Sequence, residues 1–141
     1  MVQLSHLLPG ACLVLAQPSF SRKLPFTNLV TFGDSYTDDG RLWYYVENNG
    51  QGPPPGVLPT IYNVTSGGGL SWGQLIQQMT PGLNYVNYAI SGAACSNELT
   101  ARYNVLINEN LPSVIDNAIP SFKQDVNFTS IYPDRTAENT V

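Results

Sequence analysis

The stretch that decides the fold is Leu29-Val30-Thr31-Phe32-Gly33-Asp34-Ser35-Tyr36-Thr37-Asp38-Asp39-Gly40. It begins as a short apolar run and becomes polar at Gly33, which predicts a buried strand, a tight turn and a following helix. Ser35 then lies beyond the carboxyl end of the strand, where ligands bind in open α/β sheets. Its hydroxyl, with helix N–H groups that attract negative charge, supplies two parts of an acyl-transfer site. The alternative is that Ser35 or Thr37 only caps the helix.

The composition is that of a secreted globular protein rather than a nucleic-acid-binding one. The chain has 141 residues, which indicates one domain. Charged residues make up only 11%, and six Lys and Arg stand against ten Asp and Glu for a net charge of −4. Because no basic patch is present, nucleic acid is excluded as a partner.

The N-terminus indicates export. Residues 7–16 form an apolar run that is too short to span a bilayer, so no membrane span is predicted. Val14 and Ala16 occupy the −3 and −1 positions of a signal-peptidase site. An uncleaved N-terminal arm is the alternative. We divide the chain into a signal peptide, an arm and a domain, over residues 1–16, 17–27 and 28–141.

Glycosylation sequons and cysteines fit the same extracellular compartment. Asn63 and Asn127 each begin an Asn-x-Thr acceptor sequence. Cys12 would leave with the signal peptide, which leaves Cys95 unpaired. An odd cysteine in a secreted chain calls for an explanation, and one explanation is that its partner lies outside this chain.

The middle of the chain shows a helix, a long loop and a second helix. Leu42–Val46 is an apolar run that predicts a helix, and residues 50–69 are rich in Pro and Gly and predict a loop. Ser71 and Gln74 have the spacing of a capping box. The apolar residues that follow have helical spacing and predict one buried face, made of Trp72, Leu75, Ile76 and Met79.

A second strand and turn repeat the pattern of the first. Leu83–Ile90 is apolar nearly throughout, as in a strand covered on both faces. It ends at Ser91 and Gly92, and a tight glycine turn brings backbone N–H groups close to a ligand. Gly92 is therefore a candidate donor to an oxyanion. The alternative is that Gly92 only permits the turn.

The C-terminal part predicts a broken helix and the approach to another strand. Seven apolar residues share one helical face: Leu111, Val114, Ile115, Ala118, Ile119, Phe122 and Val126. Ser113 and Asp116 mark its start, and Pro120 should kink or split it. Residues 136–141 lead toward a further strand.

Neither a metal ion nor a cofactor is predicted. Asp34, Asp38 and Asp39 lie close in sequence, but acidic residues at a helix start are explained by the helix dipole. The same three charges would repel the phosphate of a flavin at this turn, so a flavodoxin-like function ranks last. The single histidine, His6, lies in the signal segment.

The motif Gly33-Asp34-Ser35-Tyr36-Thr37-Asp38 resembles the first sequence block of the GDSL (SGNH) esterases and lipases. The order of segments after position 28 is similar to that of fungal secreted acylhydrolases of carbohydrate esterase family 16. This resemblance implies an α/β/α fold with a parallel sheet in the order 2-1-3-4-5, of which the chain supplies strands 1 and 2 and the start of 3. It implies that Ser35 is the nucleophile and an oxyanion donor, and that Gly92 is a second backbone donor.

Two family motifs are missing from the chain. A Gly-x-Asn-Asp block should follow soon after Val141, and an Asp-x-x-His should lie near the C-terminus of the family protein. A serine hydroxyl is a weak nucleophile without a base. We therefore expect an N-terminal fragment of a secreted serine esterase, with little or no activity alone. The resemblance implies a small-molecule or polysaccharide ester as substrate, with acetyl or short acyl groups on carbohydrate, and leaves the oligomeric state open.

A non-catalytic relative that binds carbohydrate or a surface as a glycoprotein is the alternative function. Four aromatic side chains could stack on sugars, namely Trp43, Tyr44, Tyr45 and Trp72. Packing in the core is the expected role for most of them.

Overall fold

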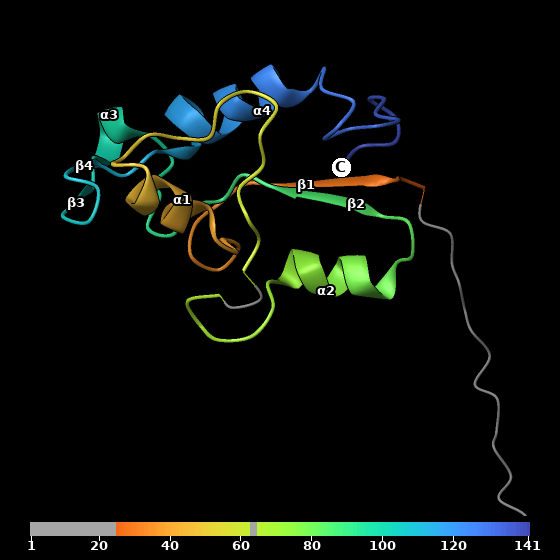
Figure 1. Cartoon of the computed structure of the whole chain (residues 1–141), viewed down its shortest axis with the longest axis horizontal. Coiled ribbons are helices and arrows are strands. Elements are labelled where there is room, and N and C mark those ends of the chain that lie inside the picture. The colour runs from red at the N-terminus through yellow and green to blue at the C-terminus, as the bar shows by residue number, and fades with distance from the viewer. Residues whose placement is uncertain (1–24, 63–64) are drawn as a thin grey trace, which may run out of the picture.

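The computed structural model describes residues 25–62 and 65–141. The expectations for the signal peptide, His6, Cys12 and the sequon at Asn63 fall outside these residues. Two short parallel strands form the centre of the molecule, β1 (Asn28–Thr31) and β2 (Asn84–Asn87). Both were predicted from their apolar runs. The architecture is therefore mixed α/β, built on a small parallel sheet (Figure 1).

A third segment lies along the other edge of β1. Thr140 forms a parallel bridge with Asn28, and the Val30 N–H donates to the Val141 carbonyl over 2.7 Å. On this edge the backbone N–H groups of Asn28 and Val30 donate to the C-terminal segment. On the opposite edge the carbonyls of Thr27 and Thr31 accept from N–H groups of β2 and of the residue that follows it. The strand therefore has neighbours on both edges, as expected if residues 136–141 lead into a further strand.

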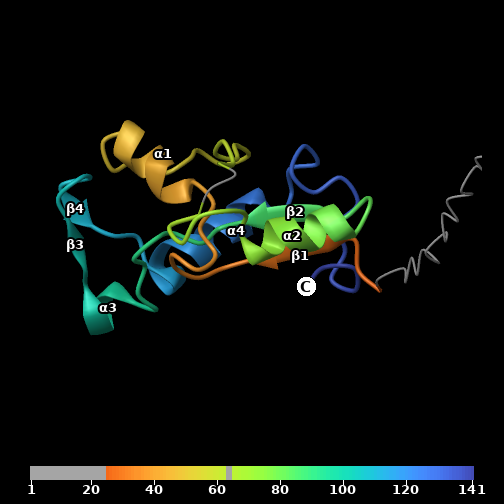
Figure 2. The same ribbon diagram turned by 90° about the horizontal axis from the view of Figure 1, so that it is seen from below.

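Helices cover both faces of this sheet (Figures 1 and 2). On one face, α2 (Trp72–Met79) places Ile76 against Leu29 and Tyr85. On the other face, a π-helical turn, η1 (Val114–Ala118), and α4 (Ile119–Asp125) pack on Val86 and Tyr88. Alternate strand residues point to opposite faces, so each strand contributes to both clusters.

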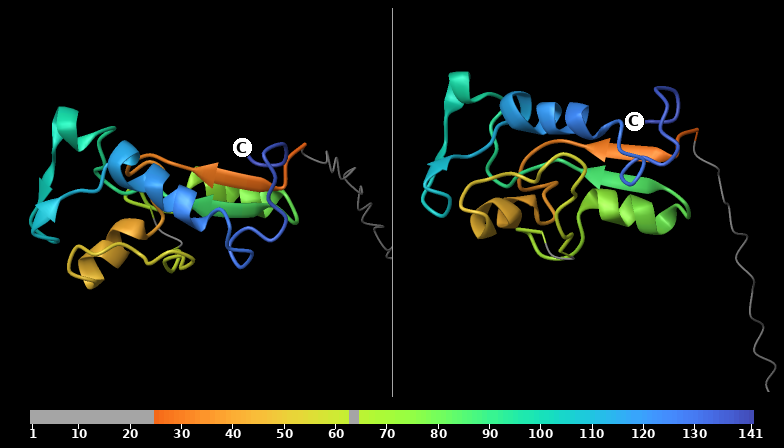
Figure 3. Two further views of the ribbon diagram at one scale, coloured as in Figure 1. Left: turned by 90° about the horizontal axis from the view of Figure 1, so that it is seen from above. Right: turned by 45° about the horizontal axis from the view of Figure 1, so that its top comes forward.

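The remaining elements lie at the carboxyl ends of the strands (Figure 3). They are α1 (Arg41–Glu47), α3 (Asn97–Thr100) and the hairpin of β3 (Tyr103–Asn104) with β4 (Glu109–Asn110). Tyr45, Ile90, Ile107 and Leu111 form the buried cluster beneath α1. The helix was predicted, whereas the hairpin was not, because two-residue strands carry no periodic signal.

The predicted buried face of α2 is wrong for three of its four residues, and only Ile76 packs on the sheet. The capping box at Ser71 is present, but Trp72, Leu75 and Met79 are 44%, 48% and 82% exposed. The helix turns Gly73 toward the sheet instead, where a Cβ atom would overlap the ring of Tyr85. Only a glycine allows this approach, and it rotates the apolar stripe toward solvent.

The predicted break at Pro120 is confirmed. The chain forms a π turn before it and an α-helix from Ile119 onward, and the Ser113 hydroxyl accepts from the Asp116 N–H at the start. The prediction that Ile115 belongs to the buried face is wrong, because it is 51% exposed. A π turn holds one more residue than an α turn, which shifts the face away from the expected 3.6-residue period.

The four aromatic residues that could stack on sugars differ in how deeply they are buried. Tyr45 is buried, as expected for a core residue, and Tyr44 is half-buried. Trp43 and Trp72 are exposed, so the expectation of core packing is wrong for both. Trp43 projects from α1 because Tyr45, two positions later, occupies the buried side of this short helix.

Candidate active site

Ser35 lies in a single turn directly after β1. The N–H groups of Thr37 and Asp38 both donate to the Asp34 carbonyl, at 3.0 and 2.9 Å. The helix expected to start at Ser35 begins only at Arg41, so neither Ser35 nor Thr37 caps it. Ser35 is half-buried, and within the described residues no hydrogen bond is recorded for its hydroxyl or its N–H. Neither group is therefore committed to a hydrogen bond within the described residues.

A single carboxylate, that of Asp38, joins this turn to the turn after β2. Its Oδ1 accepts from the N–H groups of Gly40 and Arg41 over 2.9 and 2.7 Å, at the start of α1. Its Oδ2 accepts from the N–H of Ser91 over 2.7 Å. The predicted attraction between an acidic residue and the helix start takes this form. The same side chain holds the loop at Ser91 beside the Ser35 turn.

Gly92 follows Ser91 in a left-handed conformation with φ of +83°. The Ala93 N–H closes the turn on the Ile90 carbonyl over 2.9 Å, and the Ile90 N–H donates to the Gly33 carbonyl over 3.1 Å. No acceptor for the Gly92 N–H is recorded in the part of the chain that the structure describes. The two candidate donors, Ser35 and Gly92, thus follow neighbouring strand ends that are hydrogen-bonded to each other.

Asn87 supports the Ser35 turn from below, and sequence reasoning missed it. Its Nδ2 donates to the Thr37 carbonyl over 2.6 Å. Its Oδ1 accepts from the Thr31 hydroxyl and the Ala89 N–H, each over 2.9 Å. The available signal was the pair of polar residues, Thr31 and Asn87, at the carboxyl ends of the two strands. Trp72 adds a further contact, because its indole N–H donates to the Thr37 hydroxyl over 3.1 Å.

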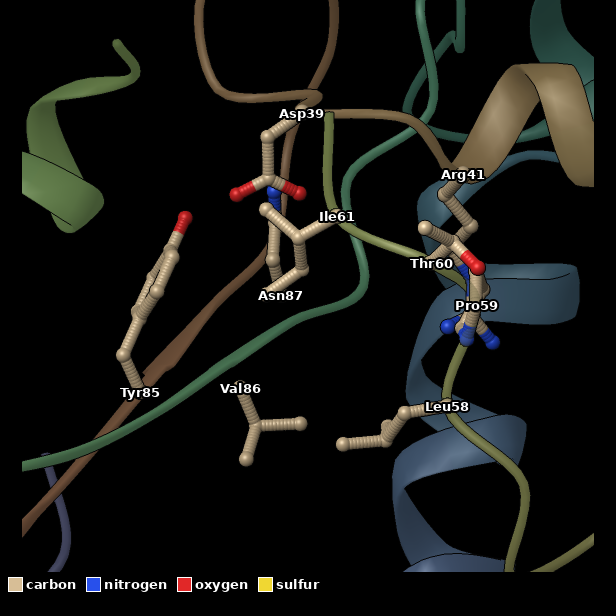
Figure 4. Close-up of a pocket in the computed structure, with 9 residues that line it drawn as sticks. All are labelled: Asp39, Arg41, Leu58, Pro59, Thr60, Ile61, Tyr85, Val86 and Asn87. Carbon is tan, nitrogen blue, oxygen red and sulfur yellow. The ribbon is translucent and has the colours of Figure 1, made fainter. Parts of the chain in front are cut away.

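Asp39 lies beneath the turn in a polar cluster. Its carboxylate accepts from the Ser71 hydroxyl over 3.4 Å and interacts with Asn87 and Tyr85. Burial raises the pKa of Asp39, although the hydrogen bonds oppose that rise. Burial also raises the pKa of Tyr85 to about 12. Asp39, Tyr85 and Asn87 line a cavity that Arg41 also lines (Figure 4).

The other candidate positions lie at the surface. Asn127 is exposed, as glycosylation requires, and Cys95 is a free, exposed cysteine. In the described ranges no three His, Cys, Asp or Glu side chains are placed to hold a metal ion together. Over the same residues no helix combines the length and apolar character needed to cross a bilayer.

Comparison with known proteins supports an esterase. The chain is 49% identical over 116 residues to an acetylesterase from Hypocrea jecorina, across 82% of this chain. It spans about a third of the length of that relative, 33%. No family model matches the chain. The chain is thus related to an ester hydrolase, of which it corresponds to one part.

Proposed function

We propose that this chain carries the nucleophile part of a secreted serine esterase of the GDSL (SGNH) type. In this proposal Ser35 attacks the ester carbonyl and releases the alcohol, and water then hydrolyses the acyl-enzyme. The N–H groups of Ser35 and Gly92 donate to the oxyanion. The substrate is an acetyl or short acyl ester, with carbohydrate as the alcohol part.

One observation carries this proposal. In a relative of an acetylesterase, a half-buried serine hydroxyl lies at the end of β1, beside a second strand end that carries Gly92. Within the described residues, neither this hydroxyl nor the Gly92 N–H has a recorded hydrogen-bond partner. Asp38 follows Ser35 in the first turn and accepts a hydrogen bond from the Ser91 N–H beside Gly92, which supports assigning both candidate donors to one oxyanion. Preorganised N–H groups of this kind stabilise the tetrahedral intermediate.

The proposed reaction also needs a base that the described residues do not contain. The one histidine of the sequence is His6, outside those residues. A serine hydrolase that lacks members of its catalytic triad retains only residual catalysis. We expect the purified 141-residue chain to show no Ser35-dependent turnover of an acetyl ester. Enzyme-like turnover that is lost in Ser35→Ala would contradict this expectation.

A chimera tests the nucleophile. Residues 28–141 replace the matching third of the Hypocrea jecorina acetylesterase, and hydrolysis of 4-nitrophenyl acetate is measured. Ser35→Ala in the chimera should reduce kcat/KM by about 1,000-fold or more. Ser130→Ala, which removes an exposed hydroxyl away from the two turns, should leave kcat/KM within about twofold. An active chimera that is insensitive to Ser35→Ala would remove Ser35 as nucleophile.

Export and glycosylation are part of the proposal. Expression in a fungal secretion host should yield a mature N-terminus at Gln17, and retention of Met1 would contradict cleavage. The exposed Asn127 should carry a glycan together with Asn63. Endoglycosidase treatment should lower the mass of the secreted chain. In Asn127→Gln this decrease in mass should be smaller by the mass of one glycan.

A non-catalytic carbohydrate-binding glycoprotein is the second candidate function. The observation that favours it is the exposure of two tryptophans, Trp43 at 54% and Trp72 at 44%. Aromatic faces of this kind can stack on sugar rings. Under this alternative, Trp43→Ala and Trp72→Ala would weaken carbohydrate binding while Ser35→Ala in the chimera would have no effect on hydrolysis.

A further inference from the structure

The segment from Ser66 to Trp72 contacts both turns of the candidate active site. At its start, the Ser66 hydroxyl lies 3.3 Å from the hydroxyl of Ser91, in the turn after β2. At its end, the Trp72 indole N–H donates to the hydroxyl of Thr37 over 3.1 Å, two residues after Ser35. One short segment is thus anchored to the turn after β1 and to the turn after β2.

Trp72 is fixed in place and still exposed. It is the first residue of α2, which begins near the carboxyl ends of β1 and β2 and runs back along the sheet (Figure 1). Its bond to Thr37 holds the edge of the indole, and Thr37 is buried and held through its carbonyl by Asn87. Trp72 nevertheless remains 44% exposed. An aromatic surface that is already held in place loses little conformational freedom when it binds a ligand.

The other exposed tryptophan lacks this arrangement. Trp43 projects from α1, and no hydrogen bond of its indole is recorded in the residues that the structure describes. Exposure alone therefore does not distinguish the two tryptophans. Trp72 differs from Trp43 because its ring is fastened beside the Ser35 turn.

The segment from Ser66 to Trp72 suits a neutral ligand that is rich in hydroxyl groups. Its sequence, Ser-Gly-Gly-Gly-Leu-Ser-Trp, has no charged side chain. The indole face carries negative charge density and attracts C–H groups, which form one face of a sugar ring. The exposed Ser66 hydroxyl keeps capacity for hydrogen bonds beyond its contact with Ser91, since a hydroxyl has one donor and two acceptor sites. A hydrocarbon chain would leave this hydroxyl unused, whereas a sugar ring matches both groups.

We propose that Trp72 is the platform for the sugar ring of the ester and so selects the alcohol part of the substrate. This inference rests on the proposed function, in which Ser35 attacks the ester carbonyl. The alcohol part then extends from the carbonyl toward the segment that ends at Trp72, where the indole covers one face of the sugar. Trp72 determines specificity in this scheme and takes no part in proton transfer.

The chimera with the Hypocrea jecorina acetylesterase tests the platform with two acetyl esters. Acetylated methyl glucoside has a sugar ring as its alcohol part, whereas ethyl acetate has no ring. The measured quantity is the ratio of kcat/KM for the sugar ester to kcat/KM for ethyl acetate. Trp72→Ala should lower this ratio by about 5- to 10-fold, as expected for one lost stacking contact. Trp72→Phe keeps an aromatic ring and should lower it by no more than about threefold.

The matched control is Trp43→Ala, which should leave the ratio unchanged. Loss of the hydrogen bond to Thr37 alone would slow both esters equally in Trp72→Phe and in Trp72→Ala, so it would not move the ratio. An unchanged ratio in Trp72→Ala, or an equal fall in Trp43→Ala, would overturn the proposal.

A binding measurement separates this inference from the proposed function. Fluorotryptophan labelling of the Ser35→Ala chimera gives a fluorine resonance for Trp72, which is identified by its loss in Trp72→Phe. Acetylated methyl glucoside should move this resonance saturably and leave that of Trp43 in place. Such a movement supports the platform even if hydrolysis by the chimera proves independent of Ser35. A stationary Trp72 resonance overturns the platform even if Ser35 proves to be the nucleophile.

Discussion

The carboxylate of Asp38 accepts a 2.7 Å hydrogen bond from the backbone N–H of Ser91, 53 positions later in the chain. The same carboxylate accepts from the N–H groups of Gly40 and Arg41 at the start of α1. One buried side chain therefore connects the turn after β1, the first turn of α1 and the turn after β2. The relative placement of Ser35 and Gly92 depends on it.

Asp38→Ala should destabilise the fold. The substitution leaves buried backbone N–H groups without an acceptor, and each such loss has a cost. We expect the free energy of unfolding to fall by about 2–4 kcal/mol, measured by urea denaturation with circular dichroism as the probe. Asp38→Asn keeps one oxygen acceptor and should fall between the wild type and Asp38→Ala.

The matched control for Asp38 is Asp134→Ala, at an exposed position. It should change the free energy of unfolding by less than about 0.5 kcal/mol, as surface substitutions usually do. An Asp38→Ala protein as stable as Asp134→Ala would show that the connection between the turns does not stabilise the fold.

Gly92→Ala should be more destabilising than Gly82→Ala. Both glycines have φ of +83°, so both substitutions carry the backbone strain of a left-handed alanine, about 1 kcal/mol. A Cβ on Gly92 would lie 2.7 Å from Leu111 Cδ1, whereas a Cβ on Gly82 would meet nothing within 4 Å. We expect Gly92→Ala to cost about 1–3 kcal/mol more than Gly82→Ala in urea denaturation.

A third variant isolates the contact with Leu111. In a Leu111→Ala background the added methyl at Gly92 has room, so the extra cost of Gly92→Ala should largely disappear. A double-mutant cycle measures this coupling. An unchanged cost would mean that strain in the backbone, and not the Leu111 side chain, requires the glycine.

Trp72→Phe should lower stability by about 0.5–1.5 kcal/mol, the net value of one hydrogen bond. The bond lost is the one from the indole N–H to the hydroxyl of Thr37, over 3.1 Å. Trp43→Phe is the matched control, since Trp43 is 54% exposed and no hydrogen bond of its indole is recorded in the described residues. Urea denaturation of the two variants should separate them. Equal effects would show that the Trp72 bond adds nothing to stability.

The sequence predicts the strands, the turns and the caps because these features are local. An apolar run that ends at Gly33 defines β1, and the Ser71 and Gln74 pair defines the start of α2. Each depends on residues close in the chain, so no tertiary information is required. The same holds for the break at Pro120.

The sequence fails where packing between distant segments decides. The stripe at Trp72 predicts a buried face, but the approach of Gly73 to Tyr85 turns it outward. Asn87 and Trp72 acquire their roles only when β1, β2 and the segment from residue 66 to 72 meet. Periodicity carries no information about those contacts, so neither the support of the Ser35 turn nor the fixed indole beside it is predictable from it.

Asp39→Asn should stabilise the protein increasingly as pH rises. Burial raises the pKa of Asp39 above its ordinary value of 3.8. Between pH 3.8 and the higher pKa of the folded state, the folded chain therefore binds more protons than the unfolded chain. The free energy of unfolding of the wild type then falls as pH rises through this range. The asparagine side chain of the variant does not titrate, so the variant lacks this loss.

Asp116→Asn provides the opposite sign. The Ser113 hydroxyl and the Asn97 N–H lower the pKa of Asp116, so its contribution to stability is present above pH 3.8 and is lost as pH falls through the lower folded pKa. Urea denaturation from about pH 3 to about pH 7.5 should show Asp39→Asn gaining on the wild type with rising pH while Asp116→Asn falls behind. All other carboxylates are present in the three proteins, so their contributions to the pH dependence cancel when each variant is compared with the wild type. Parallel curves for Asp39→Asn and the wild type would mean that Asp39 titrates at its unfolded pKa, and that its burial beneath the Ser35 turn is not maintained in solution.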